Sequence, residues 1–394
     1  MKTAAIIAEY NPFHNGHAYQ ISELKTRYGV THVIAVMNGS FMQRGEPAIF
    51  DKTLRCANAL RCGADLILEL PYVYGAQTAE IFAYGGVGIA VRAGADILSF
   101  GCEETDISLF QHAVQLLRRE NEDYRSLLKR CLDEGQSYAV SRIKALETLT
   151  GENLDFLTLP NNILALEYMR AIERMSASIS VIPIQRRHVQ YHDRGIVDGF
   201  ASASYIRSMI LSDNTAAAQA ALPYPISFKQ DELHRTDDYR YIIKSALLDK
   251  QCLKSVSDYE NGLENRFSEA LPLLNMGVEA FVSAVSTKRY AKSRLRRMLF
   301  NLIMNFSADD LAFYRDYLPG YLRILGANEK GREVINRIKE QDKTIAVSNL
   351  SKEIKNLTAE DLKIAQTERK AYALYHLFDQ KYCDDYSLKP VIVK

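Results

Sequence analysis

Sequence features that mark several specialised classes of protein are missing from this chain. Its six cysteines are scattered and no two form a CxxC pair, which argues against a zinc knuckle and against a disulfide framework. No stretch approaches the roughly 20 apolar residues of a membrane span, and the apolar run near the N-terminus is too short for a signal peptide. We therefore expect a cytoplasmic protein without a membrane partner.

A strong net charge is missing as well. The 49 basic and 48 acidic side chains give a net charge of +1, so a nucleic acid would have to bind a local basic patch. The 394 residues are 47% hydrophobic and 25% charged, which is ordinary for a globular protein of roughly two or three domains. We find no internal repeat and no low-complexity segment.

What the chain does contain is an alternation of short apolar runs and helical patterns over its first hundred residues. Helices are expected at about 17–28, 51–63 and 77–94, and the strands between them at Thr3–Tyr10, Thr31–Met37, Ala64–Pro71 and Ala95–Gly101. This order is typical of an α/β fold with a parallel sheet wrapped by helices, whose ligands bind beyond the carboxyl ends of the strands.

The rest of the chain has a different pattern. A strand over 178–187 is expected to join the same sheet, whereas the sequence after about Asp213 predicts a mostly α-helical C-terminal part. Pro223 and Pro225 interrupt the helical pattern near this change. We predict two domains, 1–215 and 216–394.

The segment EYNPFHNGH, residues 9–17, follows the first predicted strand. If His17 opens a helix, its imidazole, that of His14 and several free backbone N–H groups face one space, which is an arrangement that attracts anions. Gly16 allows a flat ligand such as a nucleotide to approach the backbone. Histidines that face a phosphate can stabilise charge on phosphorus during nucleotidyl transfer. The alternative is a helix that begins with two surface histidines.

The motif NPFHNGH resembles the HxGH nucleotidylyltransferase superfamily, which shares its adenylate-binding core with class I aminoacyl-tRNA synthetases. The superfamily's second signature, ISSTxIR, is matched by ASASYIR at 201–207, where Ala201 and Ala203 depart from the pattern. The resemblance implies that Ser202, Ser204 and Arg207 contact phosphates, although either serine could simply cap a helix. The implied fold is a Rossmann-like (HUP/nucleotidylyltransferase) parallel sheet.

Several longer segments resemble one family, the bacterial tRNA(Met) cytidine acetate ligases. They are IIAEYNPFHNGH, VMNGSFMQRGEPAIFDK, GADLILELP, LSFGCE, LPNNILALEY, YHD and TKRYAKSRLRRML. The resemblance implies ATP-dependent activation of acetate to acetyl-adenylate and transfer of the acetyl group to N4 of the wobble cytidine of elongator tRNA(Met). It also implies ATP, acetate and tRNA as ligands, and no DNA. We expect Mg²⁺ to neutralise the phosphates, although no dedicated carboxylate cage can be found in the sequence.

The resemblance assigns residues to two sites. His14 and His17 are the expected catalytic residues, and no protein ligands for a metal are predicted. Asn162 is preferred to Asn161, and Arg186 to Arg187, but both arginines are kept. The residues expected to bind ATP are Ile7, Ala8, Glu9, Tyr10, Asn11, Pro12, Phe13, His14, Asn15, Gly16, His17, Ala18, Tyr19, Gln20, Gly101, Asn162, Arg186, Arg187, Ser202, Ser204 and Arg207.

Two further segments suggest function. The loop 38–47 has glycines on both sides of Arg44 and could close over a ligand to exclude water, or be an ordinary surface loop. The segment 286–306 carries an apolar helical stripe of Leu295, Met298 or Leu299, Leu302 and Phe306. Its cations either form a solvated face or bind the RNA backbone, and they are Lys288, Arg289, Lys292, Arg294, Arg296 and Arg297.

Two other functions remain possible on the sequence alone. One is a small-molecule adenylyltransferase that acts on nicotinate mononucleotide or phosphopantetheine, which would leave the long C-terminal part unexplained. The other is a non-catalytic RNA-binding protein with this fold, which the intact His14, Gly16, His17 and Arg207 disfavour.

Overall fold

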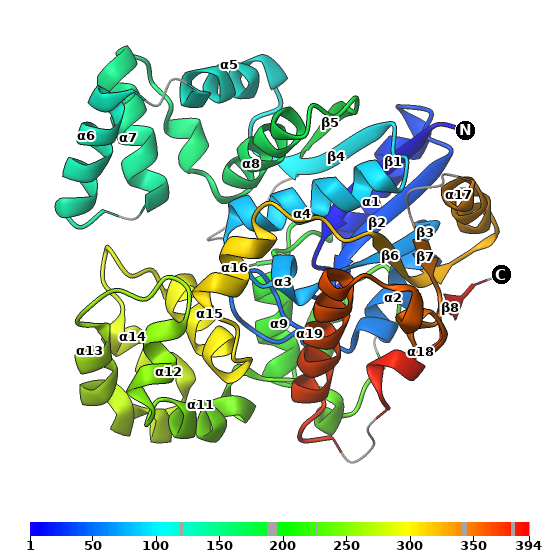
Figure 1. Ribbon diagram of the computed structural model, residues 1–394. Helices are drawn as coiled ribbons and strands as arrows, with labels where there is room; N and C mark the ends of the chain where they lie inside the picture. Colours follow the sequence, from blue (N-terminus) through cyan, green and yellow to red (C-terminus); the bar gives the residue numbers. More distant parts are fainter. Residues whose placement is uncertain are drawn as a thin grey trace.

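The computed structural model describes residues 1–118, 121–136, 138–186, 195–225, 227–340, 345–379 and 383–393. A mostly parallel sheet with the strand order β5-β4-β1-β2-β3-β6-β7 lies at its centre, and β8 pairs with β6 (Figure 1). The predicted strands are present as β1 (Thr3–Ala8), β2 (His32–Asn38), β3 (Leu66–Leu70), β4 (Ile97–Cys102) and β5 (Ser180–Gln185). These five pair in parallel, so the carboxyl ends of β1, β4 and β5 meet at one edge.

Helices connect these strands, and three of the four were expected; the four-residue helix at 72–75 was not. They are α1 (Asn15–Thr26), α2 (Lys52–Arg61), α3 (Tyr72–Gly75) and α4 (Ala79–Arg92). The predicted start of the first helix at His17 is wrong, since the side chain of His14 caps a helix that begins at Asn15. Helix α4 lies close against the sheet because Gly86 has no side chain: a Cβ there would come within 2.8 Å of Ile7.

Between β4 and β5 the chain is helical. The helices are α5 (Ile107–Arg118), α6 (Glu122–Asp133), α7 (Tyr138–Thr150), the 3-10 helix η1 (Asp155–Thr158) and α8 (Pro160–Arg174). Helix α8 packs on α4, and α6 packs on α7 beyond the sheet (Figure 1).

The C-terminal part is mostly helical, as predicted. Its helices up to residue 314 are α9 (Ala203–Leu211), α10 (Thr215–Gln219), η2 (Gln230–Glu232), η3 (Thr236–Tyr239), α11 (Arg240–Ala246), α12 (Lys250–Ser255), α13 (Leu263–Ala270), η4 (Leu271–Met276), α14 (Val278–Val285), α15 (Lys292–Ile303) and α16 (Ala308–Tyr314). The predicted stripe of α15 is buried at Leu295, Met298, Leu299 and Leu302, and Phe306 is buried just beyond the helix.

The chain then returns to the sheet, which the sequence pattern did not reveal. The last elements are β6 (Tyr321–Ala327), α17 (Glu329–Lys339), β7 (Ile345–Val347), α18 (Leu350–Glu353), η5 (Ile354–Asn356), α19 (Ala359–Tyr375), η6 (Asp385–Ser387) and β8 (Val391–Ile392). Strand β6 pairs antiparallel with β3. The apolar run of β6 is interrupted by Arg323, which is nevertheless buried because Glu69 and Asp385 neutralise it. Because β6 joins the sheet formed by the N-terminal strands, the division into 1–215 and 216–394 stays a proposal about which part of the chain has which function.

Buried charges hold this last segment in place. The ammonium Nζ of Lys52 lies 2.5 Å from Glu69 Oε1 and 2.5 Å from Asp385 Oδ1, and 3.6 Å from Glu368 Oε1. These side chains are almost fully buried, so breaking one pair would leave an uncompensated charge in the interior. Residues 368 and 385 of the C-terminal segment are thus joined to α2 and β3. Among the described helices, none has the length and apolar character needed to cross a bilayer.

Candidate active site

The two motif histidines form a reciprocal cap at the first turn of α1. His14 has an extended backbone (φ −142°, ψ 175°), and its Nδ1 accepts a hydrogen bond from the N–H of Gly16 at 3.0 Å. In return, Nδ1 of His17 accepts from the N–H of His14 at 3.2 Å. Two backbone donors that a helix normally leaves unpaired are thereby satisfied by imidazoles. The two rings stack with their centroids 3.8 Å apart.

This geometry fixes the chemical state of both rings. Because each Nδ1 is an acceptor, a neutral ring must carry its hydrogen on Nε2. Burial, together with the positive charges of Arg186 and Arg207, lowers the pKa of His14 to about 3. Burial and the neighbouring His14 and Arg186 lower the pKa of His17 well below its usual range. At neutral pH the site therefore presents two uncharged Nε2–H donors.

Two arginines influence this pair from different elements. Arg186 follows β5 directly, and its Nη1 donates to Asn161 Oδ1 at 3.4 Å. Arg207, on α9, donates to the carbonyl of Asn11 at 2.8 Å and to Glu46 Oε1 at 2.6 Å. The guanidinium of Arg207 is thus held by an acidic side chain. Arg187 and the YHD segment at 191–193 lie outside the described residues.

The second signature begins helix α9. Ser202 is its N-cap, with Oγ accepting from the N–H of Tyr205 at 3.2 Å, and the hydroxyls of Ser202 and Ser204 are 3.2 Å apart. Asn15 joins this region to α1, since its Nδ2 donates to the carbonyls of Gly199 and Ala220. The tertiary structure therefore brings residues 201–207 beside residues 11–15.

The asparagines at the start of α8 have different surroundings. Asn162 is fully buried, and its Oδ1 accepts from the N–H groups of Glu103 and Glu104 at 2.9 and 3.1 Å. It therefore shapes the loop after β4. Asn161 instead contacts Arg186 and the carboxylate of Glu103. A Cβ on Gly101 would be in ordinary van der Waals contact with the Arg186 side chain, at 3.7 Å.

The loop 38–47 is held firmly against the site. Glu9, at the end of β1, accepts from the N–H of Gln43 at 2.8 Å. The buried guanidinium of Arg55 donates to the carbonyls of Glu9 and Asn38 at 2.8 and 3.1 Å, and also to that of Gly39. Burial raises the pKa of Glu9 above its ordinary value. These contacts describe a fixed wall of the site, which is neither the closing loop nor the ordinary surface loop that the sequence left open.

The sequence pattern did not reveal the importance of Arg55, Glu46 and Glu103. Arg55 lies on the buried face of α2, where a cation among apolar residues was the available signal. Glu46 accepts a hydrogen bond from Arg207, and Glu103 accepts one from Asn161. Both contacts join residues far apart in the sequence, so local pattern could not reveal them.

The basic cluster of segment 286–306 is largely neutralised by carboxylates of the same chain. Glu260 pairs with Arg289 and Arg294, and Glu279 pairs with Lys292 and Arg296. Arg297 faces Asp258 at 3.9 Å and is only 11% exposed. These acids offset the unfavourable cations in the first turn of α15. The cluster also contacts the wall of the candidate site, because a Cβ on Gly45 would lie within 2.3 Å of the Arg297 backbone.

Comparisons with known proteins agree with this geometry. A family model described as HIGH Nucleotidyl Transferase matches residues 1–387. The tRNA(Met) cytidine acetate ligase of Caldicellulosiruptor saccharolyticus is 35% identical over 393 residues, with 96% of both chains covered. That of Clostridium kluyveri is 34% identical over 412 residues, with 100% of this chain and 99% of the relative covered.

Solved structures show the same similarity. Thermotoga maritima TmcAL bound with alpha-thio ATP aligns with a TM-score of 0.88 and 27% identity, and its apo form I with 0.89 and 28%; in both cases 100% of each chain is covered. Together the parallel sheet and the histidine pair that caps α1 define a nucleotidyl transferase of the HIGH class. Within that class the chain belongs to the tRNA(Met) cytidine acetate ligase family, which confirms the resemblance found in the sequence.

Proposed function

We propose that the protein activates acetate with ATP to acetyl-adenylate and then transfers the acetyl group to N4 of the wobble cytidine of elongator tRNA(Met). The observation that carries this proposal is the pair of neutral histidines at the N-terminus of α1, both oriented to donate through Nε2. Membership of the tRNA(Met) cytidine acetate ligase family supports acetate, ATP and tRNA as the substrates.

In the first step an acetate oxygen attacks the α-phosphorus of ATP and pyrophosphate leaves. The Nε2–H groups of His14 and His17 donate to phosphate oxygens as negative charge builds on them. Arg186 and Arg207 add positive charge from two sides, and the positive, N-terminal ends of the α1 and α9 dipoles face the same anion. Gly101, Asn161 or Asn162, Ser202, Ser204 and the 7–20 segment complete the ATP site.

Mg²⁺ would supply further neutralisation of the phosphates. Among the described residues, Glu9, Glu46 and Glu103 are acidic side chains of the candidate site, and each is already hydrogen-bonded within the protein. A cation bound mainly by phosphate oxygens and water fits such a site, because Mg²⁺ retains several waters in most nucleotide sites.

In the second step the N4 amine of cytidine attacks the acetyl carbonyl, AMP leaves, and the amine loses a proton. This amine is a weak nucleophile, so positioning provides much of the acceleration. The base must leave the anticodon stack to reach the pocket. The fixed 38–47 wall limits access of water to the acyl-adenylate, which would otherwise hydrolyse.

The two parts of the chain have different proposed roles. Residues 1–215 carry out the chemistry, and residues 216–394 bind tRNA through the basic cluster, in the cytoplasm where ATP and tRNA are found. The exposed Lys288, Arg289 and Lys292 are the cations best able to reach a phosphate backbone, since Arg294, Arg296 and Arg297 are less exposed.

One pair of assays tests the proposal. Acetate should support exchange of labelled pyrophosphate into ATP without tRNA, and labelled acetate should then appear on tRNA(Met). Exchange that requires nicotinate mononucleotide or phosphopantetheine would indicate a small-molecule adenylyltransferase. RNA binding without any exchange would indicate a non-catalytic protein.

A further inference from the structure

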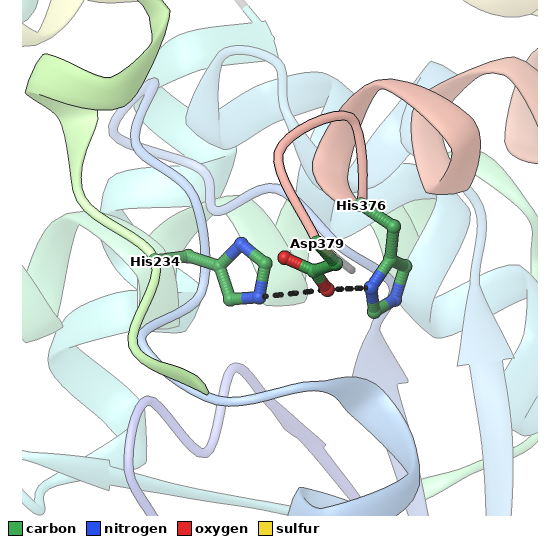
Figure 2. A group of neighbouring side chains, drawn as sticks. All are labelled: His234, His376 and Asp379. Atoms are coloured by element: carbon green, nitrogen blue, oxygen red, sulfur yellow. Dashed lines mark hydrogen bonds and ion pairs between the residues drawn. The ribbon is translucent and has the colours of Figure 1, made fainter. Parts of the chain in front are cut away.

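A cluster of two histidines and one aspartate lies outside the candidate active site. His234 precedes η3, whereas His376 and Asp379 follow the end of α19. Figure 2 shows the Asp379 carboxylate between the two imidazole rings. His234 Nε2 is 3.8 Å from Asp379 Oδ2, and His376 Nδ1 is hydrogen-bonded to the same oxygen. One donor atom from each of the three residues lies within 4.8 Å of the others.

Each ring has a second partner that sets its orientation. Nε2 of His376 is 3.1 Å from Oδ2 of Asp51, the residue that caps α2 through its other oxygen. The ring of His234 stacks on Tyr375 with centroids 3.6 Å apart and has the Tyr375 backbone as a hydrogen-bonding partner. A carboxylate or backbone carbonyl behind each histidine is the arrangement found around metal-binding imidazoles, because it orients the free nitrogen toward the cation.

We propose that His234, His376 and Asp379 bind a divalent cation of the zinc type, with Asp51 orienting His376. Two imidazole nitrogens and one carboxylate oxygen suit Zn²⁺, which binds such ligands at about 2.0–2.2 Å and retains water in an open fourth position. Tetrahedral donors are then about 3.3 Å apart, so His234 moves closer to Asp379 and the Asp379–His376 hydrogen bond opens. The two carboxylates supply the negative charge that a dication requires.

The cation would connect segments that are far apart in the sequence. It would bind the end of α19 to the segment before η3, beside the first turn of α2. Tyr375 also donates to the carbonyl of Ala48 at 2.9 Å, and the N–H of His234 donates to the carbonyl of Ile49 at 3.2 Å. Because Glu46 in this part of the chain holds Arg207, the cation would stabilise one side of the candidate active site.

The test is metal binding by the full-length protein after treatment with a chelator. Equilibrium dialysis against buffered Zn²⁺ should give one equivalent per chain, and Co²⁺ in its place should produce the visible absorption of a tetrahedral nitrogen–oxygen site. His234→Gln and Asp379→Asn should each weaken Zn²⁺ binding by about 100-fold or more. Asp51→Asn still caps α2 and should weaken binding by about 10–100-fold.

His112→Gln is the matched control, because His112 also pairs with a carboxylate, Glu152 at 2.7 Å, and no second histidine joins it among the described residues. Its Zn²⁺ affinity should equal that of the wild type. Circular dichroism identifies any variant that fails to fold, and the wild type alone should unfold at a higher temperature with Zn²⁺ than with Mg²⁺. Absence of a stoichiometric site in the wild type, or unchanged affinity in folded His234→Gln and Asp379→Asn, would leave only a hydrogen-bonded histidine–aspartate network.

Discussion

Single residues give the candidate site its chemistry through hydrogen bonds made by the protein itself. The backbone N–H groups of Gly16 and His14 occupy both Nδ1 atoms, and burial keeps both rings uncharged. The histidines therefore have a structural task, capping α1, and a proposed chemical task. A suitable substitution can separate the two.

His14→Asn is expected to separate them. Asparagine still accepts a hydrogen bond at a helix N-terminus, so the unfolding temperature should change little. The variant has no Nε2–H at the phosphate, and we expect acetate-dependent pyrophosphate exchange to fall by about 10²-fold or more. His14→Ala should show the same loss of exchange, and its free energy of unfolding should be lower by about 1 kcal/mol. Near-normal exchange by the folded asparagine variant would remove His14 from the proposed mechanism.

The ion pair between Arg207 and Glu46 leads to a second prediction. Glu46 competes with phosphate for the guanidinium, so Glu46→Gln should lower the KM for ATP several-fold. Arg207→Ala should raise this KM and leave tRNA affinity unchanged. In the Arg207→Ala background, Glu46→Gln should have no further effect, since its influence acts through the arginine. Loss of tRNA affinity with unchanged ATP kinetics would contradict the assignment of the 201–207 signature.

Among the individual elements, α15 has an apolar stripe that local pattern predicts and ion pairs that it does not. Its apolar stripe packs inward as predicted, but its cations are paired with Glu260, Glu279 and Asp258. Exposed ion pairs contribute little stability and exchange readily, so phosphates could still replace some of these acids. The outermost cations are the better candidates for RNA binding.

Charge reversal tests whether the basic cluster around the start of α15 binds RNA. Lys288→Glu combined with Lys292→Glu should weaken tRNA binding and reduce the slope of log affinity against log salt by roughly one for each phosphate that the protein no longer neutralises. Pyrophosphate exchange without tRNA should stay unchanged. The control is Lys352→Glu with Lys355→Glu, the same charge change at exposed positions of α18 and η5. Equal effects of both pairs would mean that only overall charge matters and that the RNA surface lies elsewhere.

Over the whole molecule, the buried charge network joins the C-terminal segment to the sheet. Burial, together with the charge of Glu69, raises the pKa of Glu368 from 4.5 to about 8 despite Lys52. The folded state therefore retains a proton that the unfolded state has lost between about pH 4.5 and 8. The contribution of Glu368 to the free energy of unfolding is fully present below pH 4.5. It decreases as the pH rises to about 8.

Glu368→Gln should remove this pH dependence, because glutamine resembles the protonated acid at every pH. The variant should gain stability relative to the wild type as the pH rises from 6 to 8, by no more than about 1.4 kcal/mol per pH unit. Thermal unfolding at several pH values measures the difference, with the exposed Glu360→Gln on the same helix as the control. A constant difference between variant and wild type would show that Glu368 does not titrate in this range.

Much of the fold follows from local pattern. The apolar runs that became β1 to β5, the stripe of α15 and the helix that begins within HNGH follow patterns spanning a few residues, so the sequence predicts them. The motifs likewise pointed to His14, His17 and Arg207, which the tertiary structure brings close together. The exact start of α1 escaped prediction because it depends on the side-chain cap made by His14.

Contacts between residues far apart in the sequence determine the parts of the fold and of the candidate site that local pattern does not predict. Strand β6 contains a buried arginine that is tolerable only beside Glu69 and Asp385, and the acids that neutralise α15 come from the loop before α13 and from α14. The neutral state of the two histidines requires burial by several elements, and the proposed cation site joins residues 51, 234, 376 and 379. Protonation and ion pairing depend on the charges and solvent around a group, and for these side chains folding brings those surroundings from positions far away in the chain.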